Sequence, residues 1–266
     1  MVTIPKLEMH IVDACNLRCT GCTHYADHGL RGSLDLSVAT QWLAAWSRRV
    51  SPLRFSLLGG EPLLHRDVTR FLLVVRETWP GAELRLVTNG LLLARHPELW
   101  PVLASTGAIL TVSEHARTPE YAERFAPALR LARERASDFD VRLDVRDCVT
   151  GWFKLYRGAG PAMAPFEDGD ARRSWRVCET KHCLTLRDNA LWKCPPIAHL
   201  PVVAARHGLD AEGPWQRYLA YEPLGLSATD DEIRGFVGRR EEPVCEMCPV
   251  DLRSFEKSVA GEPAPW

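Results

Sequence analysis

Three cysteines near the N-terminus constrain this chain more than any other feature, and they fall at Cys15, Cys19 and Cys22. Spacings of four and then three residues bring three thiolates around one point if the segment forms a tight loop. Thiolates are soft ligands that suit iron–sulfur clusters and zinc. A cubane cluster has four iron corners, so three cysteines leave one iron open to another ligand. We expect the chemistry of the protein at that open corner.

The rest of the first 150 or so residues alternates between strand-like and helix-like patterns. Residues 7–12, 54–58, 83–87, 108–113 and 140–145 read as strands, and helical periodicity covers 35–50, 67–79, 92–105 and 119–136. Short connections between alternating strands and helices favour a sheet of parallel strands. A complete eight-unit barrel takes about 250 residues, and the pattern ends near residue 150. We therefore predict an α/β fold with a partial (β/α)6 TIM-like barrel.

Four segments with chemistry-bearing residues follow predicted strands. They are the cysteine loop and the segments 59–62, 88–90 and 113–115. Barrels of this kind place their chemistry in loops at the carboxyl ends of the strands. The sequence therefore predicts one site on one rim, with Glu114 and His115 as further candidates for substrate or cofactor contact.

The C-terminal part of the chain differs in character. Segments 158–161 and 167–170 resemble linkers, and residues 182–195 predict a β-hairpin. Its turn, Asp188-Asn189, consists of residues that tolerate positive φ. A last helix is predicted within 229–237, before Cys245 and Cys248. We expect a barrel domain over residues 1–160 and a small C-terminal domain with the hairpin over residues 161–266.

Composition narrows the function classes. The 266 residues are 46% hydrophobic, which is enough for a large core, and the net charge of −1 points to neither nucleic acid nor an anionic membrane. There is no apolar run of about 20 residues and no secretory signal pattern. Nine cysteines without an export signal favour metal or redox chemistry in a reducing compartment over disulfides. We expect a cytoplasmic protein without nucleic-acid or membrane partners.

Two motifs together resemble the radical S-adenosylmethionine (radical SAM) superfamily: Cys15-x3-Cys19-x2-Cys22 after the first strand, and Gly59-Gly60-Glu61-Pro62 after the second. The resemblance covers roughly the first 150 residues. It implies a [4Fe–4S] cluster on the three cysteines, with SAM bound to the open iron. It also implies reductive cleavage of SAM to a 5′-deoxyadenosyl radical that takes a hydrogen atom from the substrate. An external reductant such as flavodoxin or ferredoxin is the expected protein partner.

The same resemblance implies which residues contact SAM. Glycines allow the backbone to approach a ligand closely, and in this family the turn corresponding to Gly59–Glu61 contacts the methionyl amine. Strand-end residues of such enzymes often contact ribose or carboxylate. One position departs from the family, because Gly21 stands where an aromatic residue commonly holds adenine; Tyr25 or His24 is expected to substitute. The expected SAM-binding residues are Gly59, Gly60, Glu61, Pro62, Asn89, Ser113 and Tyr25.

A second set of cysteines resembles the auxiliary-cluster domains called SPASM and, in its shortened one-cluster form, twitch. The shortened form fits better, because no cysteine follows Cys248. The expected ligands of a second [4Fe–4S] cluster are Cys183, Cys194, Cys245 and Cys248. Cys178 is able to replace Cys183, and as a spare thiol it is the candidate catalytic donor of a hydrogen atom, as in radical SAM epimerases. A buried thiol is the simpler interpretation of Cys148.

In size and cysteine layout the chain resembles the twitch-type aminocyclitol dehydrogenases of aminoglycoside biosynthesis. We predict hydrogen abstraction from a small polar metabolite, a sugar, aminocyclitol or similar natural-product intermediate, giving oxidation or epimerisation. The alternatives are a peptide-modifying radical SAM enzyme and a non-catalytic metal-binding protein. A structural zinc loop at the first cysteines and a zinc ribbon at the second set also remain open.

Overall fold

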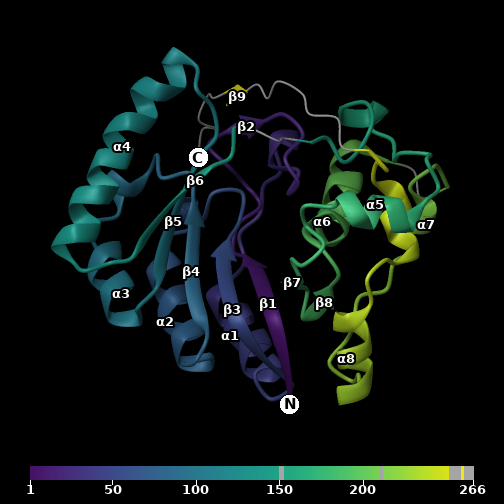
Figure 1. The fold of residues 1–266 in the computed structure, drawn as a ribbon, viewed down its shortest axis with the longest axis horizontal. Coiled ribbons are helices and arrows are strands. Elements are labelled where there is room, and N and C mark those ends of the chain that lie inside the picture. Colours follow the sequence, from purple (N-terminus) through teal and green to yellow (C-terminus); the bar gives the residue numbers. More distant parts are fainter. Residues whose placement is uncertain (150–152, 210–211, 252–258, 261–266) are drawn as a thin grey trace.

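The computed structural model describes residues 1–149, 153–209, 212–251 and 259–260. Its centre is a seven-stranded sheet in the order β6-β5-β4-β3-β1-β7-β8. Five parallel strands form most of this sheet: β1 (Val2–His10), β3 (Val50–Leu58), β4 (Glu83–Thr88), β5 (Ile109–Glu114) and β6 (Leu143–Asp147). The sheet is curved but open, with β6 and β8 at its edges (Figure 1). The predicted α/β fold with a partial barrel is confirmed.

Four helices alternate with these strands: α1 (Leu36–Trp46), α2 (Val68–Thr78), α3 (Leu99–Thr106) and α4 (Pro119–Asp138). They lie on the outer side of the sheet (Figure 1). Asp35 caps α1 by accepting hydrogen bonds from the backbone N–H groups of Ser37 and Val38. The apolar side of each helix packs on the sheet. Because the five strands are parallel, their carboxyl ends share one rim.

The predicted hairpin exists but has a different place from the one expected. It consists of β7 (Thr185–Arg187) and β8 (Ala190–Trp192), and Asp188 and Asn189 have φ of 52° and 57°. Strand β7 pairs in parallel with β1, so the hairpin extends the barrel sheet. A hairpin confined to a separate C-terminal domain was therefore wrong. The division into residues 1–160 and 161–266 stays a proposal.

Further helices lie in the C-terminal part: α5 (Ala171–Val177), α6 (Pro195–His207), α7 (Gln216–Leu219) and α8 (Asp230–Gly238). Five 3-10 segments are η1 (Ala26–His28), η2 (Pro62–Leu64), η3 (Leu93–Arg95), η4 (Gly160–Ala162) and η5 (Pro243–Met247). The short strands β2 (Arg18–Cys19) and β9 (Val259–Ala260) pair antiparallel. Segment 158–161 is no simple linker, because Arg157 and Ala164 pair around η4.

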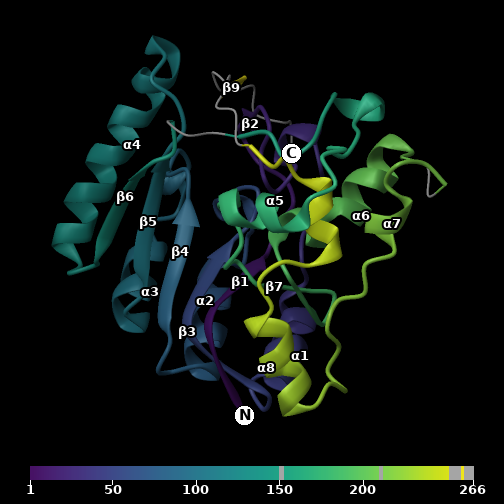
Figure 2. The same ribbon diagram turned by 45° about the vertical axis from the view of Figure 1, so that its right-hand side comes forward.

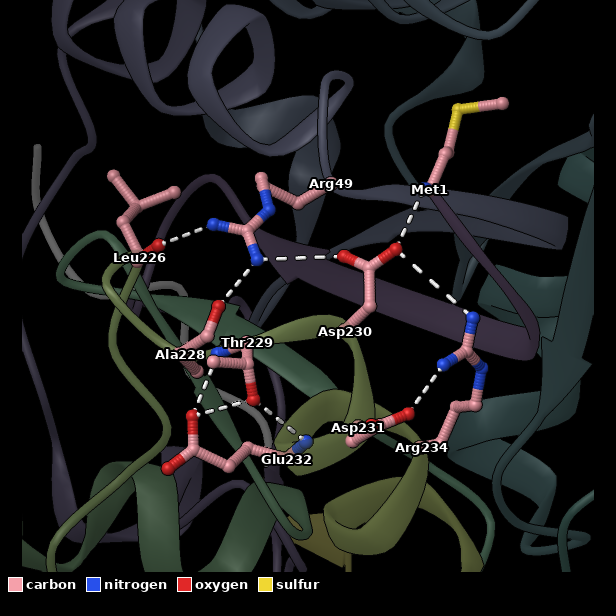
Figure 3. Close-up of polar contacts among 9 residues, drawn as sticks. All are labelled: Met1, Arg49, Leu226, Ala228, Thr229, Asp230, Asp231, Glu232 and Arg234. Carbon is pink, nitrogen blue, oxygen red and sulfur yellow. Dashed lines mark hydrogen bonds and ion pairs between the residues drawn. The ribbon is translucent and has the colours of Figure 1, made fainter.

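The start of α8 is fixed to the amino-terminal end of β1, at the opposite end of the strand from the cysteine loop. Arg49 donates to the carbonyl oxygen of Leu226 at 2.9 Å and to that of Ala228, and the Met1 amino group lies 2.8 Å from Asp230 Oδ2 (Figure 3). Thr229 and Glu232 form a capping box. Figure 2 shows α8 in front of the sheet.

Two hydrophobic cores result. The first lies between the sheet and its helices and includes Leu184, Leu186 and Leu191 of the hairpin region. The second gathers Tyr25 from the cysteine loop with Trp192 and Trp215 from the C-terminal part. The cysteine loop is therefore held by side chains from both parts of the chain. No helix in the described ranges combines the length and apolar character needed to cross a membrane.

Candidate active site

The cysteine loop begins where β1 ends, and its three cysteines line one cavity of about 280 Å³. The chain turns tightly there: Cys22 N donates to Cys19 O at 3.1 Å and Tyr25 N to Cys22 O at 2.9 Å. Burial raises the pKa of the Cys22 thiol to about 12 and that of Cys15 well above its usual value. These thiols are therefore neutral without a bound cation, and a metal centre is what would stabilise their thiolate forms.

Gly59 and Gly60 also line this cavity, and their lack of side chains serves the cysteine loop itself. A Cβ on Gly59 would lie 2.5 Å from the carbonyl oxygen of Val12, and one on Gly60 would lie 2.2 Å from that of Ala14. Gly60 N donates to Val12 O, and Glu61 N donates to Ala14 O, both at 2.8 Å. The turn thus pairs with the backbone just before Cys15. The close approach of this turn to the backbone of the cysteine loop therefore requires glycine at both positions, whether or not a ligand also approaches them.

Glu61 has an internal role. Its carboxylate is fully buried and accepts from Leu63 N at 3.0 Å, Thr88 Oγ1 at 2.6 Å and Asn89 N at 2.8 Å. Burial raises its pKa, although these hydrogen bonds oppose the shift. Neither Glu61 nor Pro62, which begins η2, lines the cavity. Among the four residues of this motif, only the two glycines lie on the cavity wall.

Asn89 and Ser113 line the cavity as the sequence predicts. Asn89 Nδ2 donates to Asn16 Oδ1 at 2.7 Å and lies 4.0 Å from Cys15 Sγ. The end of β4 therefore supports the cysteine loop through Asn16, a buried residue that the sequence reasoning did not single out. Of the pair at the end of β5, His115 lines the cavity and Glu114 does not.

Tyr25 does not line the cavity, so its expected place beside adenine was wrong. The residue has φ of 55° and packs in the second core, with its ring 5.6 Å from that of Tyr156. Its hydroxyl is buried without a hydrogen-bond partner among the described residues. His24, the other expected substitute, does line the cavity.

A trio of buried histidines joins three elements next to this cavity. The ring of His10, at the end of β1, lies 4.4 Å from that of His24 and 4.2 Å from that of His199 on α6. Burial lowers the pKa of His24 and of His199 to about 4 and that of His10 well below its usual value. All three are neutral at pH 7. The sequence analysis considered His24 alone, as a residue beside adenine, and did not predict the trio, because only the fold brings the three rings together.

Four cysteines from the C-terminal part line a second cavity: Cys178, Cys194, Cys245 and Cys248. Cys178 ends α5, Cys194 is the N-cap of α6, and Cys245 and Cys248 lie in and after η5. Lys181 and Lys193 share the lining, and the amino end of α6 faces Cys194. Both features favour thiolates. Burial nevertheless raises the pKa of Cys194 and Cys248 well above the usual value.

Cys183 lies elsewhere, so its expected place among these four was wrong and Cys178 takes it. Lys6 Nζ donates to Cys183 Sγ at 3.3 Å, because the hairpin that follows Cys183 pairs with β1. Cys178 is held at the second cavity by α5, whose Ser174 Oγ donates to the carbonyl oxygen of Cys248 at 2.8 Å. Cys178 does not line the first cavity, which contradicts its expected role as a hydrogen donor there. Cys148 does line it.

The cysteine arrangement fits clusters better than single metal ions. None of the nine cysteines, all in the described ranges, is in a disulfide. Among the described residues, no three His, Cys, Asp or Glu side chains gather as one metal ion requires. A zinc site needs all sulfurs about 2.3 Å from one point, whereas each thiolate of a cubane binds a different iron. Thiolates are the donors that such clusters use in proteins.

Comparison with known proteins gives a family model and a set of relatives. The model of the Radical SAM superfamily matches residues 9–145, just over half of the chain. GTP 3′,8-cyclase of Klebsiella pneumoniae subsp. pneumoniae is 36% identical over 99 residues, which cover 35% of this chain and 30% of the cyclase. GTP 3′,8-cyclase of Yersinia pestis is 31% identical over 96 residues. The match thus spans less than a third of these curated relatives.

Among solved structures, BtrN in complex with AdoMet and 2-DOIA has a TM-score of 0.50 and 15% sequence identity, with 92% of each chain covered. At that identity the likeness concerns the fold. It extends beyond the barrel, because nearly the whole of both chains is aligned.

Proposed function

This chain belongs to the radical SAM superfamily, and on that premise we propose that it abstracts a hydrogen atom from a small polar metabolite, giving oxidation or epimerisation. The metabolite is a sugar, an aminocyclitol or a similar natural-product intermediate. One observation carries the proposal: the three cysteines and the Gly59-Gly60 backbone line the same cavity, at the carboxyl ends of the strands.

In this proposal Cys15, Cys19 and Cys22 hold a [4Fe–4S] cluster, and SAM binds beside Gly59 and Gly60. When bound, SAM and this cluster supply radical hydrogen abstraction, and a second cluster supplies a one-electron acceptor. The protein's own contribution is position: Asn89 and the glycine turn fix the cysteine loop. An external reductant such as flavodoxin or ferredoxin delivers the electron that starts each turnover.

We further propose that Cys178, Cys194, Cys245 and Cys248 hold the second [4Fe–4S] cluster, which is a twitch-like arrangement. The unpartnered hydroxyl of Tyr25 supports this, because it belongs to the core that Cys194 and Cys248 also contact. Burial raises the pKa of Tyr25, and the Cys248 thiolate adds to the effect. A buried hydroxyl facing sulfur ligands fits a group that accepts a hydrogen bond.

Four thiolates would occupy all four irons of such a cluster, so it has no open corner for a substrate. That favours electron transfer, and hence oxidation, over direct substrate binding at this centre. Epimerisation instead needs a hydrogen donor at the first cavity, and Cys148 is a thiol on that wall outside the proposed ligand sets. A peptide-modifying or cyclising reaction, as carried out by other enzymes of the superfamily, has no separate support among the contacts of the described residues.

The proposal is tested by reconstituting the full chain anaerobically with iron and sulfide and adding SAM and dithionite. We expect formation of 5′-deoxyadenosine, stimulated by the true substrate in a screen of sugars and aminocyclitols. The C19S variant is the control and should form none, since it lacks a ligand of the SAM-binding cluster. Absence of 5′-deoxyadenosine from the wild-type protein, with iron bound, would show that the proposal is wrong.

A further inference from the structure

The wall of the first cavity is strongly basic below the rim. Four cationic side chains line it, one from each of four of the five parallel strands: Lys6 on β1, Arg54 on β3, Arg85 on β4 and Arg146 on β6. Glu8 is the one carboxylate among the lining residues. A closed barrel fills its interior with branched apolar side chains. Charged side chains in the corresponding place here indicate a cavity that receives a polar ligand.

Two carboxylates outside the lining tie the guanidinium groups into a row. Glu83 Oε1 lies 2.7 Å from Arg54 Nε and 2.8 Å from Arg85 Nε. Asp144 Oδ2 lies 2.5 Å from Arg85 Nη1 and 3.1 Å from Arg146 Nε. The row fixes the arginines before any ligand arrives, which lowers the entropic cost of binding.

The two outer arginines keep part of their binding capacity. Arg54 and Arg146 meet these carboxylates through Nε, so these ion pairs do not use their terminal nitrogens. Their side chains are 44% and 42% exposed, whereas that of Arg85 is only 9% exposed. Lys6 is paired with Glu8 at 2.6 Å. Even with Glu83 and Asp144 included, cations outnumber carboxylates.

We propose that this basic wall binds an oxyanion group, a phosphate or a carboxylate, carried by the substrate. Guanidinium forks match the geometry of both groups through paired N–H donors. The inference rests on the proposed function, because it takes the cavity beside the cysteines to be the substrate site.

The wall also sets where the anionic group lies. Arg85 is four residues before Asn89, which at about 3.3 Å per residue puts it some 13 Å below the rim where SAM would bind. The substrate therefore reaches from its reacting carbon near the rim to its anionic group deeper along the strands.

Binding is tested without turnover, on the full chain carrying its iron and in the absence of SAM. Saturation-transfer difference NMR compares methylphosphonate, acetate and the neutral acetamide at equal concentration and ionic strength. We expect at least a fivefold larger signal for one or both anions than for acetamide. Methylphosphonate alone points to a phosphate substrate, and acetate alone to a carboxylate.

Variants assign the signal to the wall. R146Q and R54Q should each reduce the anion signal severalfold, and using both guards against one failing to fold. R142Q is the matched control, because Arg142 approaches the same Glu83 at 3.7 Å but does not line the cavity. Equal signals for the three probes, or an R142Q loss as large as that of R146Q, would overturn the inference. Since no SAM is present, this outcome is separate from any failure of SAM cleavage.

Discussion

Gly60 shows how one residue controls the position of the whole cysteine loop. Its backbone N–H holds Val12, and its missing side chain makes room for the carbonyl group of Ala14. The sequence predicts a glycine turn here, but the role that it predicts for the turn is contact with a ligand. That the turn also pairs with the residues before Cys15 depends on the contact of two chain segments about 45 residues apart, which no local pattern encodes.

We expect the G60A variant to lose the first cluster. A Cβ placed 2.2 Å from Ala14 O forces the two segments apart, and overpacking of this kind costs roughly 1–3 kcal/mol. Iron analysis should show about four irons per chain where the wild type has about eight, the number in two cubanes.

G81A is the control for this change, because a Cβ on Gly81 meets nothing within 4 Å. It should keep the wild-type iron content and thermal midpoint. Full iron content in G60A would mean that the cysteine loop does not depend on the close approach of the turn.

The sequence predicts which cysteines lie together where they are close in the chain, but not where the grouping depends on the pairing of distant strands. The spacing of the first three cysteines predicted that they lie together, and they do line one cavity. Cys178 and Cys183 are five residues apart, and the spacing favoured Cys183 with Cys178 as its possible replacement. Only the pairing of β7 with β1 takes Cys183 toward Lys6 and leaves Cys178 with the other three.

At the scale of elements, turn chemistry was the most informative signal. Asp188 and Asn189 both adopt the positive φ that their residue types tolerate, so the hairpin was predicted correctly. Helix α6 was missed, although prolines at its first two positions are favourable there. Its buried residues run on several faces, because it lies between the second core and the histidine trio, and so its amphipathic period is weak.

The histidine trio links β1, the cysteine loop and α6, and it makes their packing sensitive to acid. In the unfolded chain a histidine takes up a proton below about pH 6.5, whereas His199 in the folded chain does so only near pH 4. Between these values the unfolded state binds more protons, so the free energy of unfolding falls as the pH falls.

We therefore expect H199Q to flatten this dependence. From pH 7 to pH 5 the wild-type free energy of unfolding should fall by roughly 2 kcal/mol more than that of the variant. Urea unfolding at both values measures the difference. H182Q, which changes an exposed histidine, is the control and should follow the wild type. The same fall in the free energy of unfolding from pH 7 to pH 5 for the wild type and H199Q would contradict a neutral, buried His199.

At the scale of the whole molecule, the sheet is the frame on which both cysteine sets are placed. The carboxyl ends of the parallel strands present the first set, and the hairpin added at the β1 edge leads into α6 and the second set. The sequence predicted the open α/β sheet, because its repeating βα pattern is local. It did not predict that the hairpin joins this sheet, since that pairing connects residues about 177 positions apart.

The second core completes this arrangement. Tyr25 of the cysteine loop packs with Trp192 and with residues of α6 and η5, so the two cysteine sets share a common support. The central claim is that this support carries two iron–sulfur clusters, the second one bound by Cys178 and not by Cys183.

Iron and sulfide content of C178S and C183S tests that claim most directly. After identical anaerobic reconstitution, we expect about eight irons per chain in the wild type and in C183S, and about four in C178S. Mössbauer spectra should show one cubane missing from C178S alone. Loss of four irons from C183S with full content in C178S, or equal content in all three proteins, would contradict the account.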